Sequence, residues 1–150
     1  MRHIDVYIRH DVKVMSRSEN ANYIYVMVYK QHEKEETGMV QDVTPNGAVL
    51  EAIIDSMGHM SKSETLDITV FTNNMYISGL YSNGTVKKWI ENGYMSAKGH
   101  PIADADRWKK MVDISERHKL HIIYSPQNDY SDKLDNRLSD WKKERLRFNT

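Results

Sequence analysis

Basic and aromatic side chains alternate in the segment from residue 87 to residue 98. Lysines bind phosphate groups and aromatic rings stack on sugars, so this pattern is typical of a surface that contacts nucleic acid. Glu91 dilutes the positive charge, and adjacent lysines also occur on ordinary solvated helix faces, so a structural interpretation stays open. The candidate binding residues in this segment are Lys87, Lys88, Trp89, Tyr94 and Lys98.

A second basic cluster lies close to the C-terminus. Its members are Lys142, Lys143, Arg145 and Arg147, with Glu144 among them. Because opposite charges are mixed within one polar helical pattern, we interpret this cluster as the solvated face of a C-terminal helix.

Several kinds of reactive site are excluded by residue type and spacing. The chain has no cysteine, which rules out disulfides, thiolate metal ligands and a cysteine nucleophile. Its seven histidines form neither an H-x-x-x-H pair nor an H-E-x-x-H string, so we expect no zinc site. The sequence also lacks a phosphate-binding P-loop, a G-x-G-x-x-G string and a serine elbow.

The overall charge argues against a generic nucleic-acid binder. The 150 residues include 21 Lys and Arg against 21 Asp and Glu, which gives a formal net charge of zero. Proteins that bind phosphate backbones usually carry an excess of basic residues, so phosphate affinity here must come from local patches. Without a long apolar segment or an apolar leader, we expect a cytoplasmic protein with one domain over residues 1–150.

The hydrophobic pattern predicts strands and helices that position these residues. Strands are expected at residues 3–9, 23–29, 38–43, 66–72 and 119–124, with a charged hairpin turn over residues 31–38. Helices are expected from about residue 48 to Gly58, and over residues 73–81, 85–92, 104–118 and 132–148. Three strands in succession followed by alternating strands and helices indicate a mixed sheet.

This element order and several local strings resemble ribonuclease H of the bacterial type. The matching strings are PNGAVLEAIIDSM (45–57), FTNNMYISGL (71–80) and KKWIENGYMSAKGHPIADADRW (87–108). The resemblance covers most of the chain. It implies an α/β fold, called α+β in some schemes. Its five-stranded mixed sheet has three antiparallel strands first, then two parallel ones, and is flanked by helices.

The family's chemistry uses four carboxylates around two divalent metal ions, which activate water for phosphodiester hydrolysis. Carried over position by position, these carboxylates fall on Arg9, Val49, Asn73 and Asp135. Only Asp135 is an acid, and neither Arg9 nor Val49 can ligate a metal ion. We therefore expect no intact catalytic set and no bound metal, with Arg9 pairing with Asp135 in place of the metals.

Two asparagines fall where the family contacts its substrate, but each also has a structural interpretation. Asn46 lies in the Pro45–Gly47 turn, where asparagine is common. Asn74 or its neighbour Asn73 can cap the helix that follows. Both interpretations stay open at this level.

We therefore expect a catalytically inactive ribonuclease H-like protein that needs no cofactor. Its partner is expected to be nucleic acid, as RNA–DNA hybrid or duplex, or a protein that handles nucleic acid, as an accessory inhibitor of a phage or mobile element would. The alternative is a metal-dependent ribonuclease H that cleaves the RNA strand of hybrids. That alternative requires Asp11, Asn73 and Asp135 to hold Mg²⁺ or Mn²⁺ in an unconventional site.

Overall fold

A five-stranded mixed sheet forms the centre of the molecule. The computed structural model describes the backbone of residues 1–148 and the side chains of residues 1–144. The strands are ordered β3-β2-β1-β4-β5, with antiparallel pairing among the first three and parallel pairing of β1 with β4 and of β4 with β5. This confirms the predicted sheet. The strands are β1 (Arg2–His10), β2 (Ser18–Tyr29), β3 (His32–Val43), β4 (Leu66–Thr72) and β5 (Lys119–Tyr124).

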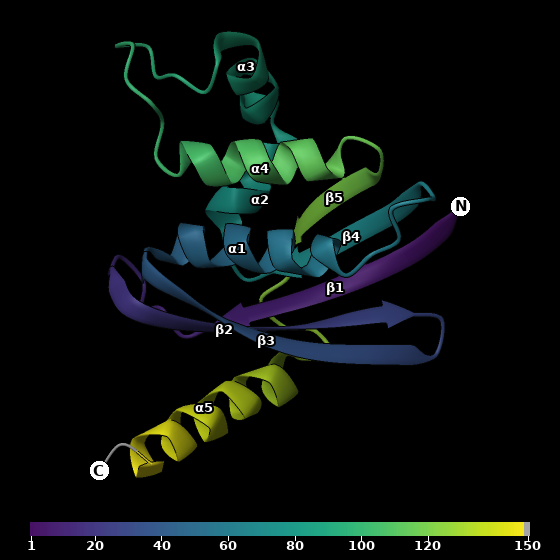
Figure 1. Cartoon of the computed structure of the whole chain (residues 1–150), viewed down its shortest axis with the longest axis vertical. Helices are drawn as coiled ribbons and strands as arrows, with labels where there is room; N and C mark the ends of the chain where they lie inside the picture. Colours follow the sequence, from purple (N-terminus) through teal and green to yellow (C-terminus); the bar gives the residue numbers. More distant parts are fainter. Residues whose placement is uncertain (149–150) are drawn as a thin grey trace.

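Helices cover both faces of this sheet. Figure 1 shows α1 and α4 on one side and α5 on the other, while α3 and the loop after it project away from the sheet. No described helix is long and apolar enough to cross a membrane. The helices are α1 (Pro45–Gly58), α2 (Met75–Ser82), α3 (Thr85–Asn92), α4 (Ala105–Ser115) and α5 (Ser131–Phe148).

Strand β2 supplies apolar side chains to both layers, which explains its continuous hydrophobic run. Tyr23 and Tyr25 face the core beneath α1, whereas Ile24 and Val26 pack against Leu134 and Leu138 of α5. Successive side chains of a strand point to opposite faces, so a strand covered on both sides loses the alternation of a half-buried strand. The sheet thereby anchors α5.

One sequence prediction about the sheet is wrong. Residues 31–38 are not a hairpin turn, because the turn is confined to Lys30 and Gln31 and β3 begins at His32. The charged residues that suggested a turn lie on an edge strand, where solvated charges are common. Two of them pair with α5: Glu33 with Lys133, and Glu35 with Arg137.

Candidate nucleic-acid interface

Arg9 lies at the carboxyl end of β1, beside the end of β4. Tyr7 is paired with Phe71 in the parallel register, which places Arg9 two residues further on, at the level of Asn73. Its side chain is 4% exposed, and its Nε lies 3.3 Å from Oδ1 of Asp135 on α5. The predicted ion pair is therefore present in the structure.

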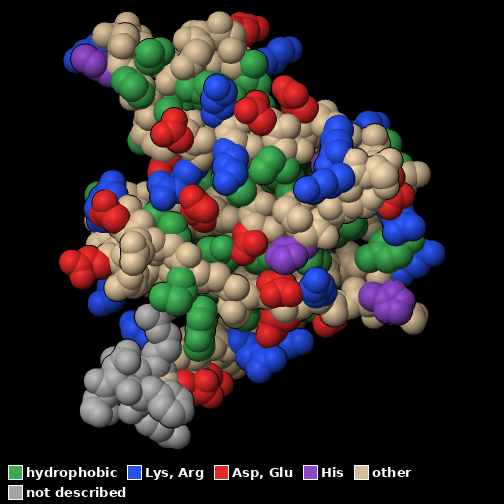
Figure 2. All heavy atoms as spheres, viewed as in Figure 1, with side chains coloured by type: hydrophobic (Ala, Val, Ile, Leu, Met, Phe, Trp, Pro, Cys, Tyr) green, Lys and Arg blue, Asp and Glu red, His purple; other side chains and the backbone are tan. Residues whose placement is uncertain are grey.

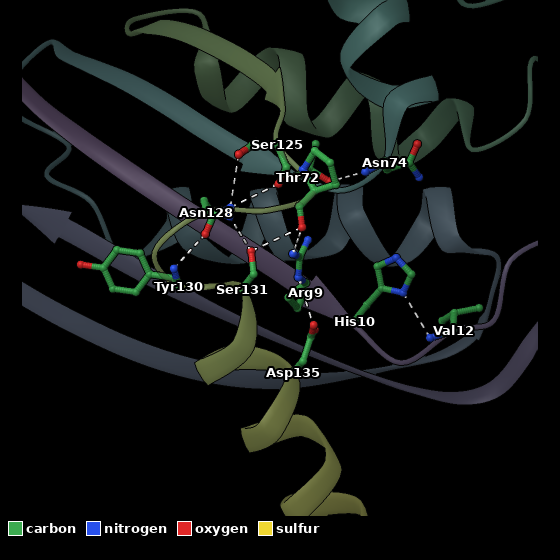
Figure 3. Close-up of polar contacts among 11 residues, drawn as sticks. Arg9, His10, Val12, Thr72, Asn74, Ser125, Asn128, Tyr130, Ser131 and Asp135 are labelled. Atoms are coloured by element: carbon green, nitrogen blue, oxygen red, sulfur yellow. Dashed lines mark hydrogen bonds and ion pairs between the residues drawn. The ribbon is translucent and has the colours of Figure 1, made fainter.

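The guanidinium of Arg9 also holds the loop between β5 and α5. Its Nη2 donates a hydrogen bond to the carbonyl of Pro126 (Figure 3). Asn128 stabilises the same loop: its amide donates to the carbonyl of Ser125 at 3.2 Å, and its side-chain oxygen accepts from the backbone of Tyr130 at 2.9 Å. Arg9 thus joins β1, this loop and α5 at a single point.

The charge at this point is unevenly compensated. The carboxylate of Asp135 is 58% exposed, whereas the guanidinium is buried and its Nη1 has no hydrogen-bond partner. Because an arginine stays protonated at any ordinary pH, a fixed positive charge occupies this end of the sheet.

Nearby acids do not complete a metal site. Asp11 accepts hydrogen bonds from the backbone and side-chain nitrogens of Asn22, at 2.8 Å and 2.7 Å. Glu51 pairs with Arg107 at 2.8 Å and Asp55 accepts a hydrogen bond from the hydroxyl of Tyr23, so both acids of α1 have partners other than Arg9.

The donor set does not fit the two divalent ions that the resemblance implies. Val49 is fully buried in the core and carries no donor atom. In the part of the chain that the structure describes, no three His, Asp or Glu side chains are placed to hold a metal ion. Hard divalent cations need several oxygen ligands, and the positions that the resemblance assigns to the family carboxylates offer Asp135 and the amide of Asn73 next to a guanidinium.

His10 is a residue of this region that the sequence prediction missed. Its Nδ1 accepts a hydrogen bond from the backbone nitrogen of Val12 at 3.1 Å. Burial lowers the pKa of the imidazole, although Asp11 acts in the opposite direction and Arg9 reinforces the effect. The ring is therefore neutral at pH 7 and carries its proton on Nε2. Its only sequence signal was its position beside Arg9.

Asn46 and Asn74 are brought together and have structural roles. The side-chain nitrogen of Asn74 donates to Oδ1 of Asn46 at 2.7 Å, which links the N-termini of α1 and α2. The Oδ1 of Asn74 accepts from the backbone nitrogen of Ile77 at 3.0 Å, so Asn74, not Asn73, caps α2. The amide of Asn73 is exposed next to this pair.

The basic and aromatic cluster divides into exposed lysines and packed rings. Lys87, Lys88 and Lys98 are exposed, as phosphate contact requires. Trp89 packs edge-on against Trp108 with 5.4 Å between ring centroids. Tyr94 is only 9% exposed and belongs to the core, so the stacking role predicted for it is wrong.

Charges of both signs are mixed on one face of the molecule. On the face that Figure 2 shows, blue Lys and Arg side chains lie among red Asp and Glu side chains, without a continuous basic area. In the C-terminal cluster Lys142 and Lys143 are exposed, while the side chains of Arg145 and Arg147 lie outside the described residues.

Comparisons with known proteins agree on one family. No family model matches the chain. It is similar to the Ribonuclease H of Desulforamulus reducens, with 30% identity over 118 residues that cover 75% of this chain and 73% of the relative.

Solved structures share the fold at low identity. The crystal structure of LC9-RNase H1, described as a type 1 RNase H with the type 2 active-site motif, has a TM-score of 0.68 at 15% identity and covers 90% of this chain and 69% of its own. The foamy viral protease-reverse transcriptase in complex with RNA/DNA hybrid has a TM-score of 0.61 at 12% identity. That match covers 89% of this chain and 18% of the viral chain.

Proposed function

The chain belongs to the ribonuclease H family, and from that membership we propose that it binds RNA–DNA hybrid or duplex nucleic acid without two-metal hydrolysis. The observation that carries this proposal is the buried guanidinium of Arg9, whose Nε lies 3.3 Å from Oδ1 of Asp135. The resemblance assigns a metal-binding carboxylate to each of these two positions, and of the four positions it assigns only Asp135 is an acid.

A fixed positive charge opposes two divalent cations at the same place. Arginine cannot lose its proton to relieve the repulsion. Its side chain also cannot turn aside at low cost, because it is buried and bonded to the carbonyl of Pro126. Arg9 therefore replaces the bridging role of the metals by joining α5 and the β5–α5 loop to β1.

Three exposed lysines supply the contact with nucleic acid in this proposal. Lys87 and Lys88 lie on α3 and Lys98 lies in the loop that follows, which together project from the body of the molecule (Figure 1). Lysines bind phosphates as point charges and read little sequence, so the expected ligand is a duplex backbone. The hybrid complex of the structurally similar foamy viral protein supports this class of ligand.

A labelled RNA–DNA hybrid tests binding and cleavage in one experiment. Fluorescence anisotropy is expected to show binding that Lys87→Glu/Lys88→Glu weakens, whereas Lys142→Glu/Lys143→Glu, a matched pair of exposed lysines on α5, leaves it unchanged. A denaturing gel of the same mixture with Mg²⁺ or Mn²⁺ is expected to show intact RNA. Equal loss of affinity in both double variants would contradict the proposed surface.

Hydrolysis of RNA in hybrids is the second candidate, and the relatives favour it because they are themselves named Ribonuclease H. It requires Asp135, with Asp11 and Asn73, to hold a single Mg²⁺ or Mn²⁺ beside Arg9. The test is whether the wild-type protein cleaves the RNA strand of the hybrid. Cleavage that Asp135→Asn abolishes and Asp140→Asn retains would establish hydrolysis in place of binding without hydrolysis, since Asp140 is an exposed acid of the same helix.

A further inference from the structure

Strand β5 forms one edge of the sheet, and its outer side is open to another strand. It pairs with β4 on one side, and among the described residues no strand follows it in the sheet (Figure 1). An edge strand presents a row of unpaired backbone N–H and C=O groups, which a second extended polypeptide matches along its whole length. The kind of partner that this edge fits is therefore a protein segment in the extended conformation.

The parallel register shows which backbone groups of β5 are free. The nitrogen of Ser125, the residue after β5, donates to the carbonyl of Thr72 at 2.8 Å, so its N–H points toward β4. Successive residues of a strand direct their backbone groups to opposite sides, so those of Leu120, Ile122 and Tyr124 point away from β4. In the part of the chain that the structure describes, no backbone hydrogen bond joins these three residues to another element.

The opposite edge of the sheet is protected in a way that β5 is not. Residues 33–36 of β3 are all charged, and two acids of this strand pair with basic side chains of α5. Charged side chains and a covering helix are usual means of blocking an edge strand. In β5 only Lys119 carries a formal charge, and Ile123 and Tyr124 are 44% and 42% exposed.

The side chains of β5 give this edge a polarity from one end to the other. Leu120 and Ile122 are buried in the core beneath α1, so Lys119, His121 and Ile123 share the opposite face of the sheet. Helix α5 packs on this face over β1 and β2, and the three side chains on β5 are exposed. A cation thus lies at the start of the edge and an apolar side chain near its end.

The ammonium group of Lys119 has no acid of its own. Asp67, its neighbour on β4, contacts His3 and His121 at 3.3 Å each. Among the described side chains, no acid lies within ion-pair distance of Lys119. Opposite charges that face each other on neighbouring strands attract, so an added strand fits best with an acid at this position. A second copy of β5 cannot supply it, because the strand contains no Asp or Glu.

We propose that β5 accepts an extended segment of a partner protein as a sixth strand, with an acidic residue facing Lys119 and an apolar residue facing Ile123. Antiparallel pairing is the more stable arrangement per residue. In that direction the apolar residue of the partner comes first and the acid follows four positions later, as the spacing of Lys119 and Ile123 requires. The proposal does not depend on hybrid binding, which we assign to the lysines of α3 and its loop.

Selection of short random peptides displayed on phage tests the predicted side-chain pattern. Peptides selected on the wild-type protein are expected to share an apolar residue followed four positions later by Asp or Glu. A synthetic copy is expected to bind Lys119→Glu about tenfold more weakly, and replacing its acid by lysine is expected to restore the affinity. Lys142→Glu, at an exposed lysine of α5, is the matched control and is expected to bind like wild type. Thermal unfolding shows whether both variants keep the fold.

Two further measurements distinguish strand addition from contacts of side chains alone. N-methylation of the peptide residues whose N–H groups face β5 is expected to abolish binding, whereas N-methylation of the intervening residues is expected to preserve it. Hydrogen exchange, measured by NMR, is expected to slow at the amides of Leu120, Ile122 and Tyr124 when the peptide binds, and to stay unchanged along β3.

Three results would overturn the proposal. The first is no enrichment of peptides, or an affinity that neither Lys119→Glu nor N-methylation changes. The second is slowed exchange of the same three amides on addition of labelled RNA–DNA hybrid without peptide, which would assign this edge to nucleic acid. The third is slowed exchange of these amides as the concentration of the protein alone is raised, which would make a second copy of the chain the occupant.

Discussion

Arg9 is a structural joint between β1, α5 and the loop that precedes α5. Its buried guanidinium contacts an acid on α5 and a carbonyl of the loop before that helix. A buried charge that loses its partner costs more than a buried pair that is removed as a whole, because the remaining charge is left without compensation. The stability of the molecule is therefore expected to respond asymmetrically to changes in this pair.

Asp135→Asn is expected to lower the free energy of unfolding by about 2 kcal/mol, because it removes the negative charge that lies 3.3 Å from a buried guanidinium. Arg9→Met/Asp135→Asn, which also removes the buried charge and keeps an apolar side chain of similar length, is expected to recover most of this loss. Urea denaturation measures both values. Asp140→Asn is the control, and an equal effect of Asp140→Asn and Asp135→Asn would show that the ion pair contributes nothing.

His10 makes the stability depend on pH in a defined direction. Burial lowers the pKa of His10 in the folded protein below the ordinary value of 6.5, so the unfolded chain binds the proton more readily. Its contribution is therefore fully present above pH 6.5 and is lost as the pH falls from 6.5 through the folded pKa.

A histidine whose pKa is raised on folding makes stability depend on pH in the opposite direction. The pKa of His3 is raised by hydrogen bonds to Asp5 and Asp67, which together outweigh its desolvation by burial. The contribution of His3 to stability is full below pH 6.5 and is lost as the pH rises through its folded pKa.

Because the pKa of His10 is lowered in the folded protein, His10→Gln is expected to flatten the loss of stability between pH 7.5 and pH 5, measured by urea denaturation at each pH. His32→Gln, an exposed histidine, serves as control, and an unchanged pH profile in His10→Gln would refute the assignment.

At the scale of elements, the β2–β3 hairpin places an aromatic ring over a glycine. Gly38 lies opposite Tyr23 in the antiparallel register, and a Cβ added there would lie 2.2 Å from both Cζ and the hydroxyl oxygen of the tyrosine. The ring is held because its hydroxyl donates to Asp55 on α1 at 2.7 Å. The close approach thus connects the edge of the sheet with the helix above it.

Gly38→Ala is expected to destabilise the protein by about 1–3 kcal/mol, because the added methyl group forces Tyr23 away from Asp55. Gly58→Ala at the end of α1 is the matched control, since a Cβ there meets no atom within 4 Å and alanine favours the helix by about 0.5 kcal/mol. Thermal unfolding compares the two variants. A Gly38→Ala variant as stable as Gly58→Ala would show that the ring moves freely.

At the scale of the whole molecule, a net charge of zero limits how strongly salt can control binding. The described arginines Arg2, Arg17, Arg107 and Arg137 already pair with acids, so phosphate contact would rely on lysines. In our proposal the lysines on α3 and its loop set the affinity for nucleic acid.

The salt dependence of hybrid binding is therefore expected to be shallow. Three lysine contacts predict a slope of about −2 to −3 for the logarithm of the association constant against the logarithm of salt concentration. Anisotropy titrations over a range of NaCl concentrations measure it, and Lys87→Glu/Lys88→Glu is expected to flatten it further. A slope several times steeper would require a larger basic surface than the proposed one.

The amino-acid sequence was enough to assign the family, through its resemblance, and to predict the order of strands and helices. The loss of metal ligands at three of the four positions that the resemblance assigns stays a prediction. Residue type and local periodicity can be read directly from a single chain. A valine or an arginine cannot ligate a metal in any fold. Local sequence could not distinguish a charged edge strand from a turn over residues 31–38, because both are solvated and polar. The position of β3 at the edge of the sheet showed that these residues form a strand.

Only the tertiary structure decided which side chains are available. Tyr94 carries the same chemistry whether buried or exposed, and its packing in the core withdraws its ring from the surface. Trp89 is partly buried and packs edge-on against Trp108, which the sequence did not predict. The pairing of Arg9 with Asp135 was predicted through the resemblance, and the packing of α5 on β1 brings the two side chains to 3.3 Å. The open edge of β5 likewise depends on which strands lie side by side in the sheet, because burial and proximity are properties of the folded chain that local sequence does not encode.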